Sequence, residues 1–201
     1  MSSHDSHDTT VVRLCLVGHF AVMRGTARVD LGDLGSRKAR TLLKLLAVER
    51  GHLVPTDRII DVLWPDGPPT QANENVATLI SRLRKTVGAN ALHGGRGGYR
   101  LGEPPFVVVD LDDGAGLVTE AERRLAGGEL ALAAAAATSA LDLLSGGRVL
   151  DDEPYAAWSE QAEAARAVLV RRARHVAAQA SLARDDPASA LAFGSAAVTD
   201  D

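Results

Sequence analysis

The stretch that decides the fold covers residues 70–87 and reads TQANENVATLISRLRKTV. Its large apolar residues recur every three or four positions, which is the spacing of one face of a helix. They are Val76, Leu79, Ile80, Leu83 and Val87. We expect Thr70 to cap the start of this helix, and Gly88 to end it because glycine readily adopts the conformation of a helix C-cap.

The opposite face of the same helix is polar in an uncommon way. A helical wheel places Thr78, Ser81, Arg82 and Lys85 there with Gln71 and Glu74, and puts Asn75 and Arg84 at its margins. Short polar side chains among arginines suit contact with base edges and the flanking phosphates of DNA. A solvated helix face is the plainer alternative, although such a face more often carries Glu–Lys pairs four residues apart.

The elements before this helix support the DNA interpretation. Short β-prone runs at residues 11–31 predict a small antiparallel sheet. Ser36 is expected to cap a helix whose face holds Ala39, Leu42, Leu43 and Leu46 and whose far side is charged. Gly51 is expected to end that helix, and Thr56 to cap a second helix with Ile59, Ile60 and Leu63 facing inward. Two helices therefore precede the decisive one.

A glycine-rich segment at residues 93–101 follows it and predicts a β-hairpin containing Arg96 and Arg100. Residues 71–100 hold five Lys and Arg against one acid, Glu74. Two helices, a longer helix and a basic hairpin are the order of a winged helix-turn-helix domain, with one helix in the major groove and the wing over the minor groove.

The second half of the chain predicts an all-helical array rich in alanine. Helices are expected at residues 117–126, 129–144, 155–183 and 188–198, packed in pairs as in tetratricopeptide (TPR)-like repeats. The prolines at 104 and 105 suggest a linker. We therefore predict a mainly α fold with a disordered tail at 1–10, a winged helix at 11–103 and a TPR-like domain at 104–201.

Charge divides at the same place. Residues 1–103 hold 14 Lys and Arg and 10 Asp and Glu, whereas residues 104–201 hold 8 and 16, so the overall charge of −4 conceals a basic half and an acidic half. This asymmetry suits one module that meets phosphate and another that meets a different partner. The absence of a long apolar run, a single cysteine at Cys15 and a polar N-terminus predict a cytoplasmic chain without a membrane partner.

Other residues receive structural interpretations. His4, Asp5, His7 and Asp8 lie in a polar terminal segment, so we expect no metal and no cofactor. Trp64, Tyr155 and Trp158 are expected to pack against helices, and the basic group Arg171, Arg172 and Arg174 to form a solvated face. Phosphate-loop, nucleophile-elbow and zinc-protease motifs are missing from the sequence, which argues against an enzyme.

Two segments carry a resemblance to known regulators. The sequence SRLRK at residues 81–85 and GYRL at 98–101 resemble the recognition helix and wing of OmpR/PhoB-type domains. Residues 16–31, 38–46, 57–64 and 80–87 are similar to the SARP (antibiotic regulatory protein) family of activators. Residues 152–155 and 162–166 are similar to the bacterial transcriptional activation domain of that family. The resemblance covers residues 12–200.

The resemblance implies a role for each matching position. Thr78, Ser81, Arg82 and Lys85 would enter the major groove with Asn75 beside them, while Arg84, Arg37 and Lys38 would touch phosphate. Arg96 and Arg100 would form the wing, although the segment Arg-Gly-Gly-Tyr is one residue shorter than the family pattern. The family also implies dimerisation on promoter DNA and recruitment of RNA polymerase through its sigma subunit.

Two other functions remain open at this stage. The chain could be a protein-interaction scaffold whose winged helix has lost DNA affinity, or the N-terminal part of a larger multidomain regulator. The variant Arg82→Ala separates the first of these from an activator, because only an activator should lose DNA binding with its fold intact.

Overall fold

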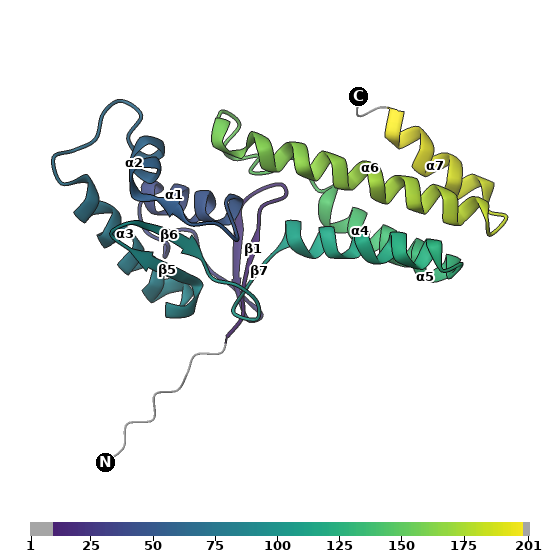
Figure 1. Ribbon diagram of the computed structural model, residues 1–201, viewed down its shortest axis with the longest axis horizontal. Coiled ribbons are helices and arrows are strands. Elements are labelled where there is room, and N and C mark those ends of the chain that lie inside the picture. The colour runs from purple at the N-terminus through teal and green to yellow at the C-terminus, as the bar shows by residue number, and fades with distance from the viewer. Residues whose placement is uncertain (1–9, 199–201) are drawn as a thin grey trace, which may run out of the picture. The chain divides into compact units, whose positions relative to one another are not determined.

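The computed structural model describes residues 10–198 of the chain, which form two compact units (Figure 1). Unit 1 comprises the residues up to Cys15 and residues 20–109, and unit 2 comprises Leu16–His19 and the residues from Asp110 onward. The boundary expected at residues 103 and 104 thus falls inside unit 1. Most of the tail expected at 1–10, including His4, Asp5, His7 and Asp8, lies outside the described residues.

Unit 1 begins with a four-stranded sheet in the order β3-β2-β1-β7. Its strands are β1 (Val12–Cys15), β2 (Ala21–Arg24), β3 (Ala27–Arg28) and β7 (Val107–Val109). The β1–β2 and β2–β3 pairs are antiparallel, as expected. The β7 strand is parallel to β1, with Val12 opposite Val107, and the sequence did not predict it. This pairing brings residues 107–109 back into unit 1.

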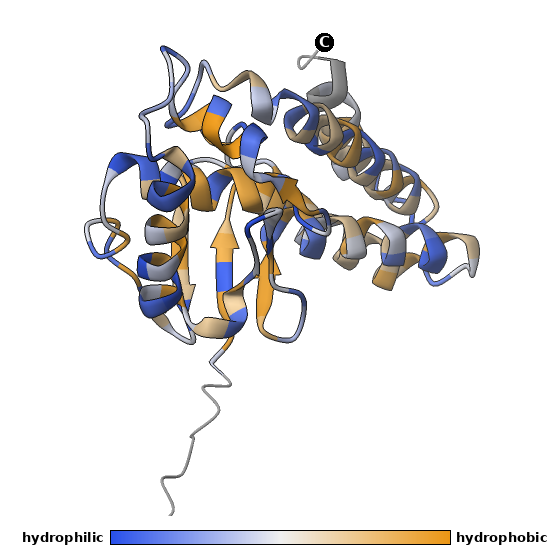
Figure 2. Cartoon of the chain, turned by 60° about the vertical axis from the view of Figure 1, so that its left-hand side comes forward, coloured by the Kyte–Doolittle hydropathy of each residue, from blue (hydrophilic) through white to orange (hydrophobic). Residues whose placement is uncertain are grey.

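Three helices cover the core of unit 1. They are α1 (Arg37–Val48), α2 (Thr56–Leu63) and α3 (Ala72–Val87). The apolar face predicted for each helix is buried, which confirms the periodicity argument. Figure 2 shows hydrophobic residues along the strands and hydrophilic residues on the outer turns of the helices. The core is therefore built from the amphipathic pattern of the sequence.

The helix ends were predicted less well than the helix faces. Ser36 caps α1 as expected, because its Oγ accepts a hydrogen bond from the backbone N–H of Ala39 at 3.3 Å. Thr56 and Thr70 are not caps. Pro55 stands at the N-cap position of α2 and Gln71 at that of α3, and neither makes a side-chain capping bond.

Two further expectations for the ends and faces of these helices need correction. The α1 helix ends at Val48 with Glu49 as its C-cap, so Gly51 lies in the turn that follows. The far side of α1 is not simply charged. Lys44 is 3% exposed, and its ammonium lies 5.5 Å from the centre of the Phe20 ring. The aliphatic stem of this lysine is buried with its neighbours, while its charge meets the face of an aromatic ring.

A second, three-stranded sheet forms the wing, in the order β4-β6-β5. Its strands are β4 (Val54–Pro55), β5 (Leu92–Gly95) and β6 (Gly98–Leu101), and a single 3₁₀ turn, η1 (Ala89–Ala91), leads from α3 into it. The antiparallel β5–β6 hairpin confirms the prediction. The β4 strand adds a third member from the segment between α1 and α2, which the sequence indicated only as an extended link.

Unit 2 is helical in its described residues, apart from isolated bridges and loops. It contains α4 (Asp110–Ala126), α5 (Leu130–Leu144), η2 (Ala157–Ser159), α6 (Glu160–Leu182) and α7 (Pro187–Val198). One cluster of its buried core is made mostly of small residues that let helices approach closely, namely Ala121, Ala133, Ala137, Val176, Ala177 and Ala180. None of the helices in the described part of the chain has the length and apolar composition to cross a membrane.

The paired helices of unit 2 confirm the TPR-like array, but α4 is longer than predicted. It begins at Asp110 instead of residue 117, and its first turn carries Asp110, Asp112 and Asp113. Carboxylates in the first turn of a helix interact favourably with its dipole, which offsets the low helix propensity of the glycines that follow. Tyr155 was expected to pack against helices, and that was wrong because it is 97% exposed.

Residues 16–19 complete unit 2 although they lie between β1 and β2 in the sequence. The backbone N–H groups of Leu16 and Val17 donate to Oδ2 of Asp110 at 2.8 and 2.9 Å. The loop before η2 pairs with the same segment, since Leu150 donates to the carbonyl of Leu16 at 2.8 Å and Gly18 donates to that of Arg148 at 2.7 Å. A short piece of the N-terminal sequence thus closes one end of unit 2.

Candidate nucleic-acid interface

The solvent face of α3 presents most of the polar residues predicted to meet DNA. The side chains of Asn75, Thr78, Ser81, Arg82 and Lys85 are all exposed, while the apolar side of the helix is buried. Thr78 donates its hydroxyl to the carbonyl of Glu74 at 2.9 Å, which fixes that side chain against its own helix. The structure therefore places these five residues together on one accessible helix face.

The cations of this face are available to an external ligand. Within the described chain, the guanidinium of Arg82 and the ammonium of Lys85 make no hydrogen bond or ion pair. Lys85 lies in the last turn of α3, where a cation also interacts favourably with the helix dipole. Two uncompensated charges one turn apart can neutralise phosphates on either side of a groove.

Arg84 has a different environment. Its Nε donates to the carbonyl of Leu92 at 3.0 Å and its Nη2 donates to the carbonyl of Gly94 at 3.2 Å. Both acceptors belong to β5, so the guanidinium fastens the wing to α3. Arg84 therefore positions the wing against α3, and its expected phosphate contact stays a prediction that would have to use the remaining donors of the guanidinium.

Lys38 is also engaged inside unit 1. Its ammonium donates to the carbonyl of Leu63 at the end of α2 and lies 4.8 Å from the centre of the Trp64 ring. Trp64 is half-buried, which agrees with a packing role. The predicted phosphate contact at Lys38 would require its ammonium to leave these partners, whereas Arg37 beside it is exposed.

The wing ends in a tight two-residue turn at Arg96 and Gly97, because Gly95 and Gly98 are the last paired residues of the hairpin. Gly98 has a φ of +152°, and a Cβ there would lie 2.5 Å from the carbonyl oxygen of Val54 on β4. Glycine is thus required where β4 approaches the hairpin. The shortened wing is a closed hairpin held from the side by a third strand.

The two wing arginines differ in their freedom. Arg96 is exposed at the turn, and its guanidinium has no hydrogen bond or ion pair to any described residue. Arg100 pairs with Glu103, with Nη1 2.7 Å from Oε1, and both side chains are well exposed. Arg96 is therefore the stronger candidate for a groove contact, since Arg100 must first leave its carboxylate.

Thr56 contacts the wing, although the sequence analysis expected it to cap α2. Its hydroxyl donates to the carbonyl of Arg96 at 3.1 Å, and the residue is 7% exposed. The expected capping bond is thus replaced by a bond to the wing tip. A polar residue directly after Pro55 was the available signal, but its partner lies 40 residues further along the chain.

Groups of three or more His, Cys, Asp or Glu side chains with metal-binding geometry do not occur among residues 10–198. The interface therefore consists of hydrogen-bonding and cationic side chains on α3 and the wing.

Comparison with known proteins finds a similarity over this part of the chain. Residues 34–101 match the family model described as "Transcriptional regulatory protein, C terminal". This range covers α1, α2, α3 and the wing. Its helices and hairpin are the elements that carry the candidate interface.

Curated relatives extend the similarity. The regulatory protein AfsR of Streptomyces griseus is 32% identical over 118 residues, which are 59% of this chain and 12% of that protein. The regulatory protein DnrI of Streptomyces peucetius is 35% identical over 127 residues, which are 58% of this chain and 46% of that protein. The chain thus spans less than half the length of these relatives.

A solved structure covers nearly the whole chain. The structure of Mycobacterium tuberculosis EmbR in complex with a low-affinity phosphopeptide has a TM-score of 0.82 and 25% identity, and the match covers 95% of this chain and 51% of that one. The fold of the winged helix and the fold of the helical unit 2 are therefore both similar to that of EmbR. The chain is thus similar over residues 34–101 to a transcriptional regulatory domain family, and over more than half of its length to the regulatory proteins AfsR and DnrI.

Proposed function

We propose that this protein is a sequence-specific DNA-binding activator of transcription. In this proposal α3 lies in the major groove, where Thr78, Ser81 and Arg82 read base edges and Asn75 and Lys85 flank them. Arg96 extends from the wing over the adjacent minor groove. The family description and the names of the relatives support regulation of transcription.

The observation that carries the proposal is the exposed face of α3. It presents short polar side chains and two cations that have no partner in the described chain, beside a wing whose tip arginine is likewise unpaired. A helix that only needed solubility would gain from pairing these charges on its own surface. Leaving them unpaired is the arrangement that a polyanionic ligand would use.

The test is binding to duplexes selected from a random library, measured by fluorescence anisotropy at several salt concentrations. The unaltered chain should prefer the selected duplex, and Arg82→Ala should weaken that preference by about tenfold or more, which corresponds to one good base contact. Arg28→Ala is the matched control. It removes the same charge from exposed β3 and should leave binding unchanged.

The opposite results would favour the scaffold function instead. A reading role for α3 would be contradicted if the chain did not prefer the selected duplex over random duplex, or if binding did not depend on salt. It would also be contradicted if Arg82→Ala and Arg28→Ala lost equal affinity for the selected duplex. The winged helix would then be a protein-binding module.

The activator part of the proposal is supported by unit 2. Residues 104–201 carry 8 Lys and Arg against 16 Asp and Glu, so this half would avoid DNA and suits a protein partner. We propose RNA polymerase with its sigma subunit as that partner, and a homodimer on DNA repeats spaced about 10–11 bp apart. The protein should increase transcription in vitro from a promoter whose repeats are one helical turn apart. Inserting half a turn of DNA between the repeats should reduce this increase.

A further inference from the structure

An apolar groove of about 410 Å³ lies on unit 2 between the second half of α4 and the second half of α6. Its apolar lining consists of Leu125, Ala126 and Val176, and polar side chains of both helices border it. The volume is near the lower end of the range of small-ligand sites. The groove therefore suits a small molecule better than a protein helix.

The apolar lining is held in place by the core of unit 2. Val176 is 2% exposed and belongs to the buried cluster that includes Ala121 and Ala177. Leu125 is half-buried and packs against the same cluster, whereas Ala126 at the end of α4 is exposed. Because helix packing fixes these residues, a ligand would meet an apolar surface that is already formed. Binding would then need little ordering of the protein.

An ion pair joins the two helices at this groove. The guanidinium of Arg172 on α6 donates from Nε and Nη2 to the two carboxylate oxygens of Glu122 on α4, at 2.8 and 2.7 Å. These hydrogen bonds lower the pKa of Glu122, with a smaller contribution from His175, and they outweigh the effect of burial, which raises it. The carboxylate of Glu122 is therefore ionised at neutral pH and neutralised by Arg172, so the pair adds no net charge to the groove.

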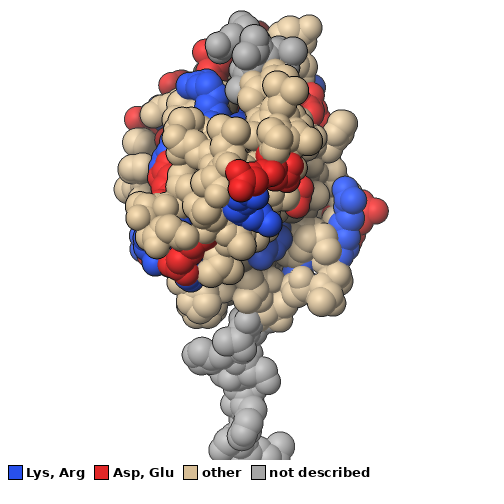
Figure 3. Space-filling model, turned by 90° about the vertical axis from the view of Figure 1, so that its right-hand side faces the viewer, with Lys and Arg blue, Asp and Glu red and all other residues tan. Residues whose placement is uncertain are grey.

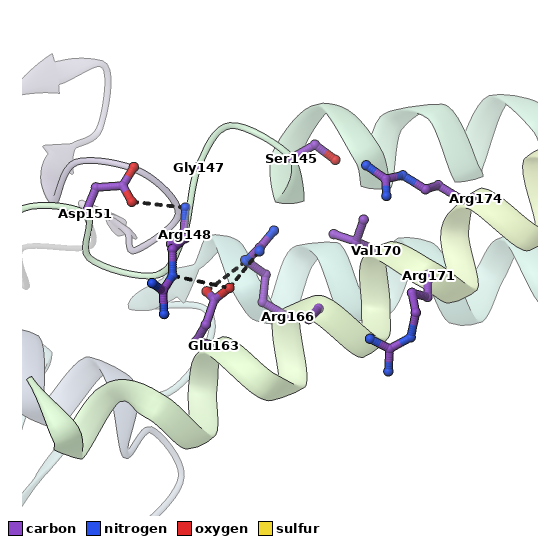
Figure 4. Close-up of a pocket in the computed structure, with 10 residues that line it drawn as sticks. Ser145, Gly147, Arg148, Asp151, Glu163, Arg166, Val170, Arg171 and Arg174 are labelled. Atoms are coloured by element: carbon purple, nitrogen blue, oxygen red, sulfur yellow. Dashed lines mark hydrogen bonds and ion pairs between the residues drawn. The ribbon is translucent and has the colours of Figure 1, made fainter. Parts of the chain in front are cut away.

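Arg171 is a cation of the groove that the described part of the protein does not neutralise. The residue is exposed, and its guanidinium makes no hydrogen bond or ion pair with the described residues. Figure 4, a close-up of an adjoining pocket, shows it apart from Glu163, whose carboxylate pairs with Arg166 at 2.8 Å. With histidine counted as neutral, the lining of the groove holds two arginines and one carboxylate, which leaves one positive charge.

Several other arginines of unit 2 have carboxylate partners. Arg123 and Arg124 both pair with Glu120 at 2.7 Å. Figure 3 shows basic and acidic side chains adjacent to one another on the face that it presents. An unpaired arginine beside an apolar groove thus departs from the pattern of this acidic unit. It is an arrangement that an anion with an apolar body would use.

We propose that this groove binds a small amphiphilic monocarboxylate, such as a medium-chain fatty acid. Its hydrocarbon chain would cover Leu125, Ala126 and Val176, and its carboxylate would accept hydrogen bonds from the guanidinium of Arg171. Arginine binds carboxylates in a bidentate manner, and one carboxylate matches the one uncompensated charge of the lining. Burial of the chain removes apolar surface from water, which adds to the affinity. The site lies within unit 2 and does not depend on the proposed DNA interface.

The experiment measures binding of octanoate to the full chain by isothermal titration calorimetry without DNA. Octanol carries a chain of the same length without the charge, and acetate carries the charge without the chain. We expect saturable one-to-one binding of octanoate, binding of octanol that is weaker by at least about tenfold, and no detectable binding of acetate. This ranking follows because the site uses both the guanidinium and the apolar lining.

Two positions test the charge of the groove. Arg171→Ala should weaken octanoate binding at least about tenfold and leave octanol binding unchanged, whereas Arg171→Lys should lose less. Gln179→Glu adds a second carboxylate to the lining, so it should weaken the binding of octanoate but not that of octanol. Arg171 and Gln179 are exposed, so all three variants should keep the melting temperature of the unaltered chain.

Matched controls give the test its specificity. Arg184→Ala removes an exposed arginine outside the groove, and Gln161→Glu adds a carboxylate to an exposed position of α6 outside it. Both should leave octanoate binding unchanged. The proposal would be overturned if octanoate did not bind saturably, if octanol bound as tightly as octanoate, or if Arg171→Ala and Arg184→Ala lost equal affinity.

A second copy of the chain is the other occupant that the test distinguishes. If a second copy covers the groove, sedimentation velocity without DNA will show a dimer, Gln179→Glu will convert it to a monomer, and octanoate will not bind. That result would also overturn the proposal. A species of the same size with and without saturating octanoate, together with one-to-one binding, would support it.

Discussion

Arg84 and Leu92 join α3 to the wing, because Nε of Arg84 donates to the carbonyl oxygen of Leu92 at 3.0 Å. A second bond runs from the same guanidinium to Gly94 at 3.2 Å. Arg84 and its neighbour Lys85 therefore have different tasks although both are basic. Arg84 is bonded to β5, whereas the ammonium of Lys85 makes no hydrogen bond or ion pair with the described residues and is proposed to meet DNA.

Replacing Arg84 with glutamine should lower the stability of unit 1. The loss of two charged hydrogen bonds at a half-buried site is expected to cost about 1–2 kcal/mol in the free energy of unfolding by urea. DNA affinity should fall without a change in its salt dependence, because no phosphate contact is lost. Lys85→Ala is the comparison, and it should leave stability unchanged while reducing the salt slope by about 1. A reduced slope in Arg84→Gln would show a phosphate contact instead.

Thr56 should control the mobility of the wing tip. Thr56→Val keeps the shape of the side chain but removes the donor to the carbonyl of Arg96, at a cost of about 1 kcal/mol. Amide hydrogen exchange at Gly97 and Gly98 should become faster. Thr56→Ser retains the hydroxyl and should exchange like the unaltered chain; equal acceleration in both variants would mean that the hydroxyl is not the anchor.

Gly98 should not tolerate a side chain. Gly98→Ala places a Cβ 2.5 Å from the carbonyl oxygen of Val54 at a φ of +152°. We therefore expect the free energy of unfolding to fall by about 1–3 kcal/mol and β4 to be displaced. Gly97→Ala is the control, since no atom lies within 4 Å of the Cβ added there. Equal urea midpoints for these two variants would contradict the requirement for glycine at position 98.

Glu163 should make the stability of unit 2 depend on acid. Its folded pKa is lowered from an ordinary value of 4.5, so its contribution is complete above 4.5 and is lost as the pH falls through the folded pKa. Glu163→Gln should therefore lower the free energy of unfolding by about 1–2 kcal/mol at pH 7. Between pH 5 and 3 the free energy of unfolding of this variant should fall less than that of the unaltered chain. Glu160→Gln, an exposed neighbour, should preserve the profile of urea midpoints against pH. If the profiles of Glu163→Gln and the unaltered chain run parallel, Glu163 is not the source of the acid dependence.

The sequence predicted the parts of the fold that local pattern determines. The stripe from Val76 to Val87 is buried as its spacing required, and the hairpin followed from its glycines. The β7 strand was missed because Val107–Val109 is a three-residue run whose only strand signal is its pairing with β1. That partner is too distant in the chain for any local pattern to show.

The start of α4 was missed for a related reason. Residues 110–116 read DLDDGAG, which locally favours a loop, yet Gly114 lies where a Cβ would be 2.6 Å from the side chain of Leu144. The glycine allows α4 and α5 to approach closely, so a tertiary contact overrides helix propensity. Similarly, composition identified the basic face of α3, but only coordinates separated Arg84 and Lys38 from the cations that remain exposed.

The segment at residues 16–19 constrains how such proteins can recombine. It lies between two strands of unit 1 in the gene but closes a loop of unit 2, where Gly18 adopts a φ of +77° with Gly146 packed 3.2 Å from its potential Cβ. A single crossover that exchanged the C-terminal helices between two relatives would set this segment against a foreign loop. We therefore expect the two units to be inherited together, and substitutions at residues 16–19 to be accompanied by substitutions at 146–151.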